Sequence, residues 1–252
     1  MVNRSGHVHP RRARVLVQCA MLTALLVLGS ADIRLGGSAY AHEVQPIRIF
    51  LNVGEGQREG VINIRNTRDK ALPVEIAVFR RIVSEDGAQN LVPADDDFLV
   101  FPPQMLVAQG SSQSVRFQYI GDPRISESIS YIIEAQEVPV VPDGFTGIAT
   151  VYNVGSAVYM QPARPRAELA ISNIQRDGDV VRFEVRNTGN DYSFLTLIAL
   201  ELIFGTEKFT LEAETVNEII RNPIVPPNSL RRFEMDVSRF PDGTPEIRFG
   251  RV

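Results

Sequence analysis

The sequence predicts an all-β protein with two β-sandwich domains that follow a cleaved signal peptide. Three observations carry this prediction. After residue 42, short runs of alternating or β-branched residues are separated by Gly, Pro, Asp and Asn, and no convincing helix-period stretch interrupts them. A similar strand pattern occurs twice along the chain. The first residues have the charge and hydropathy of an export signal.

The first 41 residues are interpreted as a signal peptide. Four arginines precede an apolar run over 15–28, and the Ala-Tyr-Ala site at 39–41 fits cleavage before His42. Cleavage after Ala31 is a second option, and a retained anchor helix is disfavoured because the apolar run is short for a bilayer span. The mature protein is therefore expected to be exported.

The composition of the mature chain excludes several function classes. Loss of residues 1–41 leaves 21 basic and 29 acidic residues, a net charge of −8, which is unfavourable for nucleic-acid binding. The only cysteine, Cys19, and two of the three histidines, His7 and His9, leave with the signal. Disulfides, histidine triads, His/Cys zinc sites and cysteine nucleophiles are thereby excluded. We expect no enzyme activity, no cofactor and no small-molecule substrate.

Two domains are predicted, 42–162 and 163–252, joined at the Pro- and Arg-rich stretch 161–166. The pattern over 59–79 is echoed over 179–202. Each copy has an alternating strand that ends in Arg-Asn-Thr, a polar turn and another apolar strand. The repeat favours duplicated β-sandwiches.

Three motifs in the first domain have ordinary structural interpretations. The glycine-rich stretch 54–60 has the wrong spacing for a phosphate loop and is interpreted as a strand connection. The aspartates 95–97 are interpreted as a solvated turn in preference to a calcium site, so no metal site is expected. A cis proline within the stretch 100–103, which contains Pro102 and Pro103, would suit a sandwich edge.

The stretch 147–162 alternates as a strand, and both of its faces are largely apolar. An ordinary surface strand needs only one apolar face, so the second face requires a cover. One face carries Ile148, Thr150, Tyr152, Val154, Ser156 and Val158, and the other carries Ala149, Val151, Asn153, Ala157 and Tyr159.

Several charged residues are open to two interpretations. Arg48, among apolar residues near the mature N-terminus, is either a strand-edge arginine that faces water or an anchor for a carboxylate, which guanidinium binds in a bidentate manner. Arg116, Glu127 and Asp242 are either surface charges or a salt-bridge set.

These stretches together resemble the periplasmic pilus assembly chaperones of the PapD-like family. The resemblance is carried by the order and spacing of 46–67, 71–81, 95–119, 127–140 and the alternating strand, and it continues more weakly to the C-terminus. It implies two immunoglobulin-like sandwiches in a boomerang arrangement, in the periplasm.

The resemblance also implies donor-strand complementation, in which the chaperone lends a strand (here 147–160) to a pilus subunit before assembly at an outer-membrane usher. Ala149, Val151 and Tyr159 would then pack into the chaperone's own first domain. Main-chain hydrogen bonds give affinity in such strand addition, and alternate side chains select the register. The residues expected to enter the subunit are Ile148, Thr150, Tyr152, Val154 and Val158.

In the family, a cleft arginine and a lysine bind the subunit's C-terminal carboxylate. Arg48 matches the arginine, but Ala157 stands at the lysine position, and Arg164 is the first candidate for a substitute. Arg116, Glu127 and Asp242 match positions linked to an interdomain salt bridge.

The sequence therefore favours a periplasmic chaperone for pilus subunits over two alternatives. One is a secreted structural or adhesive module or fibre subunit, for which residues 42–45 are too short an exchangeable N-terminal extension. The other is a carboxylate-based hydrolase, for which no pair of acids is recognisable.

Overall fold

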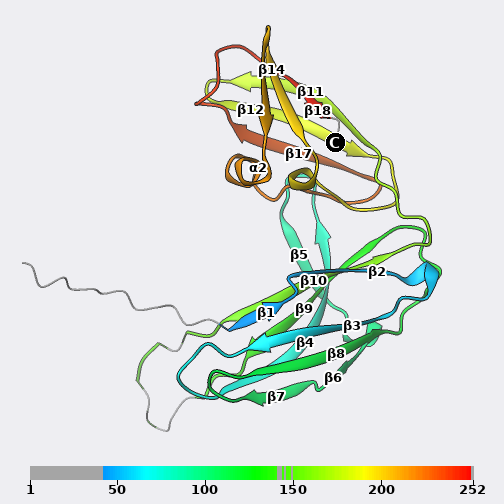
Figure 1. Ribbon diagram of the computed structural model, residues 1–252, viewed down its shortest axis with the longest axis vertical. Helices are drawn as coiled ribbons and strands as arrows, with labels where there is room; N and C mark the ends of the chain where they lie inside the picture. Colours follow the sequence, from blue (N-terminus) through cyan, green and yellow to red (C-terminus); the bar gives the residue numbers. More distant parts are fainter. Residues whose placement is uncertain (1–41, 141–143, 145, 149, 251–252) are drawn as a thin grey trace, which may run out of the picture. The chain divides into compact units, whose positions relative to one another are not determined.

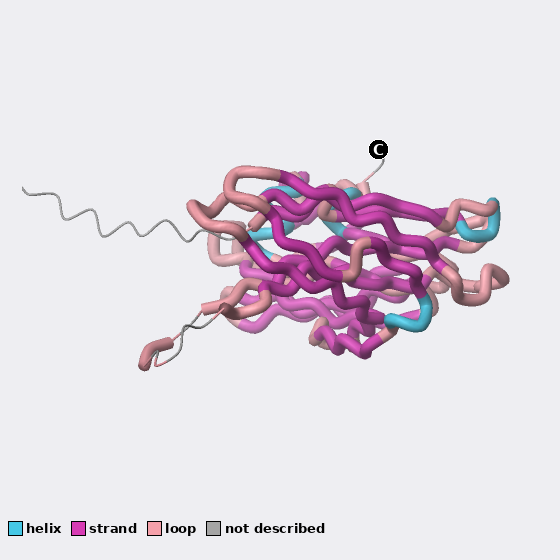
Figure 2. Tube along the Cα trace, turned by 90° about the horizontal axis from the view of Figure 1, so that it is seen from below, coloured by secondary structure: helices cyan, strands magenta, loops and turns pink. Residues whose placement is uncertain are grey.

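The computed structural model describes residues 42–140, 144, 146–148 and 150–250. The predicted signal peptide, residues 1–41, lies outside the described residues. Strands make up most of the described chain, and helical segments are confined to short connections (Figure 2). None of the helices in this part of the chain is long and apolar enough to cross a membrane. The predicted all-β class is confirmed.

The first sandwich consists of two sheets (Figure 1). One sheet has the order β1 (Glu43–Gln45), β3 (Glu59–Arg65), β8 (Ser112–Tyr119) and β6 (Phe98–Phe101). The other has the order β2 (Arg48–Asn52), β10 (Asn153–Gln161), β9 (Ile129–Glu137), β4 (Leu72–Val83) and β5 (Gln89–Pro93), and β7 (Gln104–Val107) also pairs with β4. Short 3-10 turns at Val53–Glu55 and Asp95–Asp97 connect strands.

Alternation along these strands fills the space between the two sheets. Val115, Phe117 and Tyr119 of β8 are buried, and Arg116 between them is exposed. The chain enters the fold in one sheet and changes to the other between β1 and β2, where the Gln45–Pro46 peptide bond is cis. The Phe101–Pro102 bond is also cis, so that one of the two prolines of the stretch 100–103 follows a cis peptide bond.

The second sandwich has its own buried core. One sheet has the order β11 (Leu169–Asp177), β12 (Val180–Asn187) and β17 (Ser229–Asp236), and a second has the order β15 (Glu207–Leu211), β14 (Leu200–Phe204) and β18 (Glu246–Phe249). A smaller pair is formed by β13 (Ser193–Phe194) and β16 (Ile224–Val225), next to the 3-10 turn Leu195–Leu197. Helix α2 (Ala213–Ile219) is an addition to the predicted elements, because seven residues are too few to show a helical period.

The repeated Arg-Asn-Thr motif has the same structural role in both sandwiches. Asn66 and Asn187 are both buried, and each accepts a backbone N–H from the residue two positions later. Each also donates from its side-chain amide to the carbonyl four positions later, Lys70 in the first case and Asp191 in the second. The motif is therefore an asparagine-stabilised turn that ends a strand.

A buried arginine joins the β4–β5 hairpin to the second sandwich. Arg231 of β17 donates to the carbonyl oxygens of Ser84 and Glu85 at 3.2 and 2.7 Å, and to those of Ile224 and Asn222, both at 2.9 Å. Burial lowers the pKa of this guanidinium, because burial disfavours its charged form. The charge is accommodated by carbonyl dipoles in place of a carboxylate.

Candidate functional site

Strand β10 is shorter than the sequence pattern indicates. The expected strand 147–160 begins only at Asn153 and extends to Gln161. Ile148, Thr150, Val151 and Tyr152 lie before it and outside any strand, and we call these four residues the exposed segment. Ala149 lies outside the described residues.

One face of this stretch passes gradually from the protein's own core to solvent. Val158 is 0% exposed and Ser156 is also buried, Val154 packs against the core from its margin, and Ile148 is 95% exposed. The prediction that Val158 enters a partner is therefore wrong, since its side chain already fills the core of the first sandwich. Ile148 and Thr150 continue the same face and are exposed, whereas Tyr152, between them and Val154, is half-buried.

The opposite face also differs from the expectation. Val151 is 43% exposed and does not pack into the first sandwich. Tyr159 is buried, but on the other side of the sheet from the core. Its ring lies 5.0 Å from that of Phe50 and 5.4 Å from that of Phe194, measured between centroids. The second apolar face is thus covered by aromatic residues in its C-terminal half.

The backbone of β10 has one open edge. Strand β9 pairs with β10 from Asn153 to Met160 on one side. On the other side, β2 pairs with β10 in parallel only from Ala157 to Gln161, as far as the described residues show. The edge from Asn153 to Ser156 can therefore accept another strand, except where the Ser156 hydroxyl already donates to the carbonyl of Pro46.

The parallel register places Arg48 directly beside Ala157. Arg48 is half-buried, and its guanidinium carbon lies 4.1 Å from the centroid of the Phe194 ring. Within the described part of the chain, this side chain makes no hydrogen bond or ion pair. A guanidinium held on an aromatic ring without a counter-ion is suited to bind an anion. Arg164, the expected second cation, is exposed, and its carbonyl oxygen accepts a hydrogen bond from the side-chain amide of Asn190 at 3.2 Å.

Sequence reasoning missed a second cation on this side of the sheet. Arg81 of β4 is buried, and its guanidinium donates to the hydroxyl oxygens of Ser130, at 3.0 Å, and Tyr159. Burial raises the pKa of Tyr159, although Arg81 and Arg48 both act to lower it. Alternation along β4 could not have revealed Arg81, because the buried positions 72, 74, 76 and 78 put Arg80 at the inward parity, and the pattern changes before Arg81.

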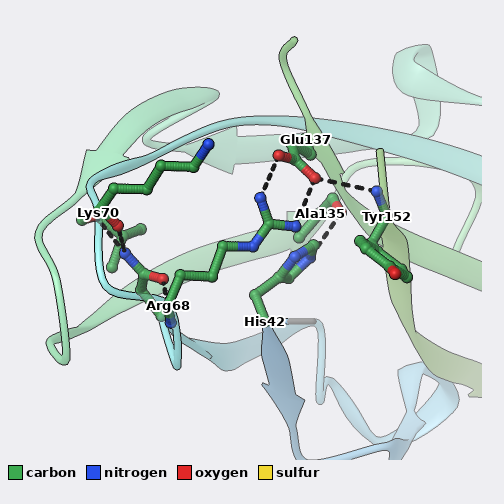
Figure 3. A network of polar contacts seen from close by, with 8 residues as sticks. His42, Arg68, Lys70, Ala135, Glu137 and Tyr152 are labelled. Atoms are coloured by element: carbon green, nitrogen blue, oxygen red, sulfur yellow. Dashed lines mark hydrogen bonds and ion pairs between the residues drawn. The ribbon is translucent and has the colours of Figure 1, made fainter. Parts of the chain in front are cut away.

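A polar network lies where the exposed segment meets β10 (Figure 3). Arg68, in the turn after β3, forms a two-point ion pair with Glu137 at the end of β9, with Nη2 and Oε2 2.6 Å apart. The same carboxylate accepts the backbone N–H of Tyr152 at 3.1 Å. Beside them, the Nε2 of buried His42 lies 3.0 Å from the carbonyl oxygen of Ala135, and its Nδ1 has no partner in the described structure.

Two pKa shifts follow from this arrangement. Burial lowers the pKa of His42, and the nearby Arg68 adds to the shift, whereas the bond to Ala135 and the charge of Glu137 oppose it. Burial alone would raise the pKa of Glu137, but the hydrogen bonds from Arg68 and Tyr152 outweigh burial, so that this pKa is lowered. Near neutral pH, His42 is therefore neutral and Glu137 is ionised.

We expect stability to decline as the pH falls below 6.5, the ordinary pKa of histidine. In that range an unfolded chain takes up a proton on His42 that the folded chain does not, so unfolding is favoured. Urea unfolding at pH 7.5, 6.5 and 5.5 measures the slope. His42→Gln, which keeps a donor for Ala135, is expected to flatten it. An unchanged slope in this variant would assign the effect to other groups.

The three residues of the expected interdomain salt bridge do not come together, and this prediction is wrong. Arg116 lies on β8, opposite Val61 of β3. Glu127 accepts a hydrogen bond from the side-chain amide of Asn228 at 2.8 Å, so it does contact the second sandwich, but without an ion pair. Asp242 is exposed and lies 3.9 Å from Arg176. Hydrogen bonds join the sandwiches, among them those of Arg231 and the one that the Ser128 hydroxyl donates to Asp191.

Comparison with protein families gives one match, to the description "Pili and flagellar-assembly chaperone, PapD N-terminal domain", over residues 42–166. This range contains the first sandwich, the exposed segment and both arginines near Tyr159. A comparison with curated proteins finds no match.

Solved structures with the same fold cover most of the chain. The Class 5 fimbriae chaperone CfaA is 14% identical, with a TM-score of 0.52, and the match covers 83% of this chain and 98% of that one. The YadV chaperone is 12% identical, with a TM-score of 0.53 and coverage of 82% and 91%. A chaperone–tip adhesin complex of CFA/I fimbriae biogenesis is 13% identical, with a TM-score of 0.52 and coverage of 83% and 98%. At these identities the likeness establishes the fold.

Proposed function

Because the chain belongs, through residues 42–166, to the PapD-like family of pili and flagellar-assembly chaperones, we propose that it binds a fibre subunit by lending the exposed segment and the open edge of β10. The observation that carries this proposal is the single face that is buried at Val158 and bare at Ile148. The stretch from Ile148 to Val158 thus has a C-terminal half that is anchored in the first sandwich and an N-terminal half that is uncovered.

The uncovered half has the chemistry that strand addition requires. Its backbone edge offers hydrogen-bonding groups, and Ile148, Thr150 and Tyr152 alternate on the face proposed to enter the subunit, with half-buried Val154 at the margin between the two halves. Burial of such side chains contributes roughly 1.5–3 kcal/mol each, from which ordering and association costs are subtracted. Val158 serves differently from the other members of this face, since it anchors the strand in the chaperone.

Arg48 is the proposed anchor for the carboxylate at the subunit's C-terminus. The residue is half-buried, its guanidinium lacks a counter-ion among the described residues, and it lies beside the position where the lent strand becomes part of the first sandwich. Arg164 remains the proposed second cation, and its exposed side chain is able to turn toward a bound chain.

The proposed setting is the periplasm, with subunit delivery to an outer-membrane usher. The export signal predicted in residues 1–41 supports this setting, as does the similarity to fimbrial chaperones. A bound subunit would also cover apolar groups that are exposed in the free protein, Ile148 above all.

The test is co-expression of the full-length chain with the candidate fibre subunits of its host, followed by co-purification. The wild type is expected to retain a subunit in equal stoichiometry, whereas Tyr152→Arg is expected to lose it, because the arginine would bury a charge in the subunit. Arg48→Ala is expected to weaken retention by removing the anchor. Val151→Arg, a change at the adjacent residue on the opposite face, is the matched control.

All variants must be folded by circular dichroism for the comparison to count. If no subunit from any set accompanies the wild type, the chaperone proposal is wrong. Equal loss in Tyr152→Arg and Val151→Arg would contradict lending by the proposed face.

A further inference from the structure

The ladder between β9 and β10 ends in an unusual way at Tyr152. Its last backbone bond runs from the Glu137 N–H to the Tyr152 carbonyl, at 3.3 Å. The reciprocal N–H of Tyr152 donates to the side-chain carboxylate of Glu137 at 3.1 Å. The N–H of Val138 points to the other side of β9 and donates to the carbonyl of Pro73 in β4, and Pro139, which has no N–H, cannot continue the ladder toward β10. Tyr152 is thus the last residue of the stretch that the protein's own sheet holds.

The carboxylate that receives Tyr152 is itself fixed from a distant part of the chain. Arg68 holds both oxygens of Glu137, and the two side chains are only 9% and 10% exposed. The backbone N–H of Arg68 donates at 3.0 Å to the side chain of Asn66, which is buried in the strand-ending turn of the first sandwich. The guanidinium also lies 5.6 Å from the centroid of the Tyr152 ring.

We propose that Arg68 and Glu137 are positioning residues that fix Tyr152 as the boundary between the part of the strand that the chaperone keeps and the part that it lends. This inference rests on the proposed function. A shift of one residue in strand pairing turns every side chain to the opposite face. A fixed boundary at Tyr152 therefore keeps Ile148 and Thr150 on the face continuous with Val158, so the pair selects the register in which a subunit is engaged.

Three variants separate this role from that of a simple stabilising ion pair. Glu137→Leu removes both the acceptor for Tyr152 and the ion pair, whereas Glu137→Gln keeps an acceptor and loses the charge. The exchanged double variant Arg68→Glu with Glu137→Arg restores the ion pair, but arginine has no acceptor to offer the Tyr152 N–H. Glu43→Gln is the matched control, because it breaks the exposed Arg65–Glu43 pair on the neighbouring strands.

The first readout is amide hydrogen exchange of the full chain without any subunit. Exchange at Tyr152 is expected to be at least tenfold faster in Glu137→Leu and in the exchanged variant. Glu137→Gln should be intermediate, Glu43→Gln should match the wild type, and the amide of Ile133 should be unchanged throughout. Recovery of protection in the exchanged variant would overturn the proposal, because the ion pair alone would then suffice.

The second readout is subunit retention in the same co-expression experiment. Glu137→Leu and the exchanged variant are expected to retain at least tenfold less subunit, although both stay folded. If their Tyr152 amides exchange faster but retention equals that of the wild type, the boundary has no role in lending and the inference is wrong. If instead the wild type retains no subunit, the proposed function fails, while the exchange data still report on the boundary.

Discussion

Replacement of Arg231 by methionine is expected to lower the free energy of unfolding by roughly 3 kcal/mol, because it leaves buried carbonyl oxygens without a donor. Methionine fills much of the space of the arginine stem but offers no N–H group. The carbonyls of Ser84, Glu85, Asn222 and Ile224 each accept from this one side chain. The desolvation cost of the guanidinium is removed as well, but its four acceptors remain in place.

The matched control is the adjacent residue. Arg232→Met removes exposed ion pairs with Glu85 and Glu184 and is expected to cost less than about 1 kcal/mol, as is usual for surface pairs. Urea unfolding of both variants at pH 7.5 gives the comparison. A loss in Arg231→Met no larger than in Arg232→Met would contradict the structural role of the carbonyl contacts.

Gly87, in the β4–β5 hairpin, allows an independent test of the contact between this hairpin and Arg231. A Cβ placed on Gly87 would lie 2.6 Å from the Arg231 Nη2, and this glycine has a φ of +91°. Gly56 has nearly the same φ, +90°, but nothing within 4 Å of such a Cβ. Gly56→Ala therefore measures the backbone cost alone, about 1–3 kcal/mol. Gly87→Ala should cost more, by the amount that the displaced guanidinium contributes.

The sequence predicted the fold class well because the strands of both sandwiches alternate cleanly. In β8 and in β17, every second residue is buried over most of the strand, as in Phe117 and Phe233. The Arg-Asn-Thr repeat was a stronger signal than three shared residues suggest, since Asn66 and Asn187 make equivalent hydrogen bonds. Helix α2 could not be predicted in this way, because its seven residues span only two turns.

The partners of buried charges are much harder to predict from the sequence. Arg231 occupies an inward position of an alternating strand, a signal that identifies it as unusual. Its four acceptors are backbone carbonyls, which every residue possesses, and two of them lie almost 150 positions earlier. Arg68 and Glu137 are likewise 69 positions apart, and no local spacing relates them. Only the folded topology brings these groups together.

The start of β10 was mispredicted for a related reason. Alternation continues through 147–160, but a strand is ordered by its neighbours, and β9 and β2 pair with β10 only from Asn153 and Ala157 onward. The sequence pattern therefore reflects two kinds of strand pairing. One is the pairing of β10 with β9 and β2 in the free protein, and the other is a pairing that the exposed segment is able to make with a further strand. Val158 and Ile148 lie on the same face of the alternating pattern, but Val158 is buried and Ile148 is exposed. The alternation alone does not distinguish the two positions.

This difference leads to the second large effect. Ile148→Ala is expected to weaken subunit capture by roughly 10- to 100-fold, which corresponds to the loss of about 1.5–3 kcal/mol of apolar burial in the complex. Because Ile148 is almost fully exposed in the free protein, the same change should alter the free energy of unfolding by less than about 0.5 kcal/mol. Binding and stability are thus expected to separate at this position.

Val158→Ala on the same face is expected to give the opposite result. Val158 is fully buried, so loss of its two methyl groups should destabilise the free protein by roughly 2 kcal/mol, including the cavity left behind. Capture, measured at a temperature where the variant remains folded, should change by less than about threefold, since the side chain never reaches the subunit. Titration of a purified subunit and urea unfolding, applied to both variants, measure the two quantities. If Val158→Ala weakens capture as much as Ile148→Ala does, the lent face extends further into β10 than the free protein indicates, and the boundary at Tyr152 is misplaced.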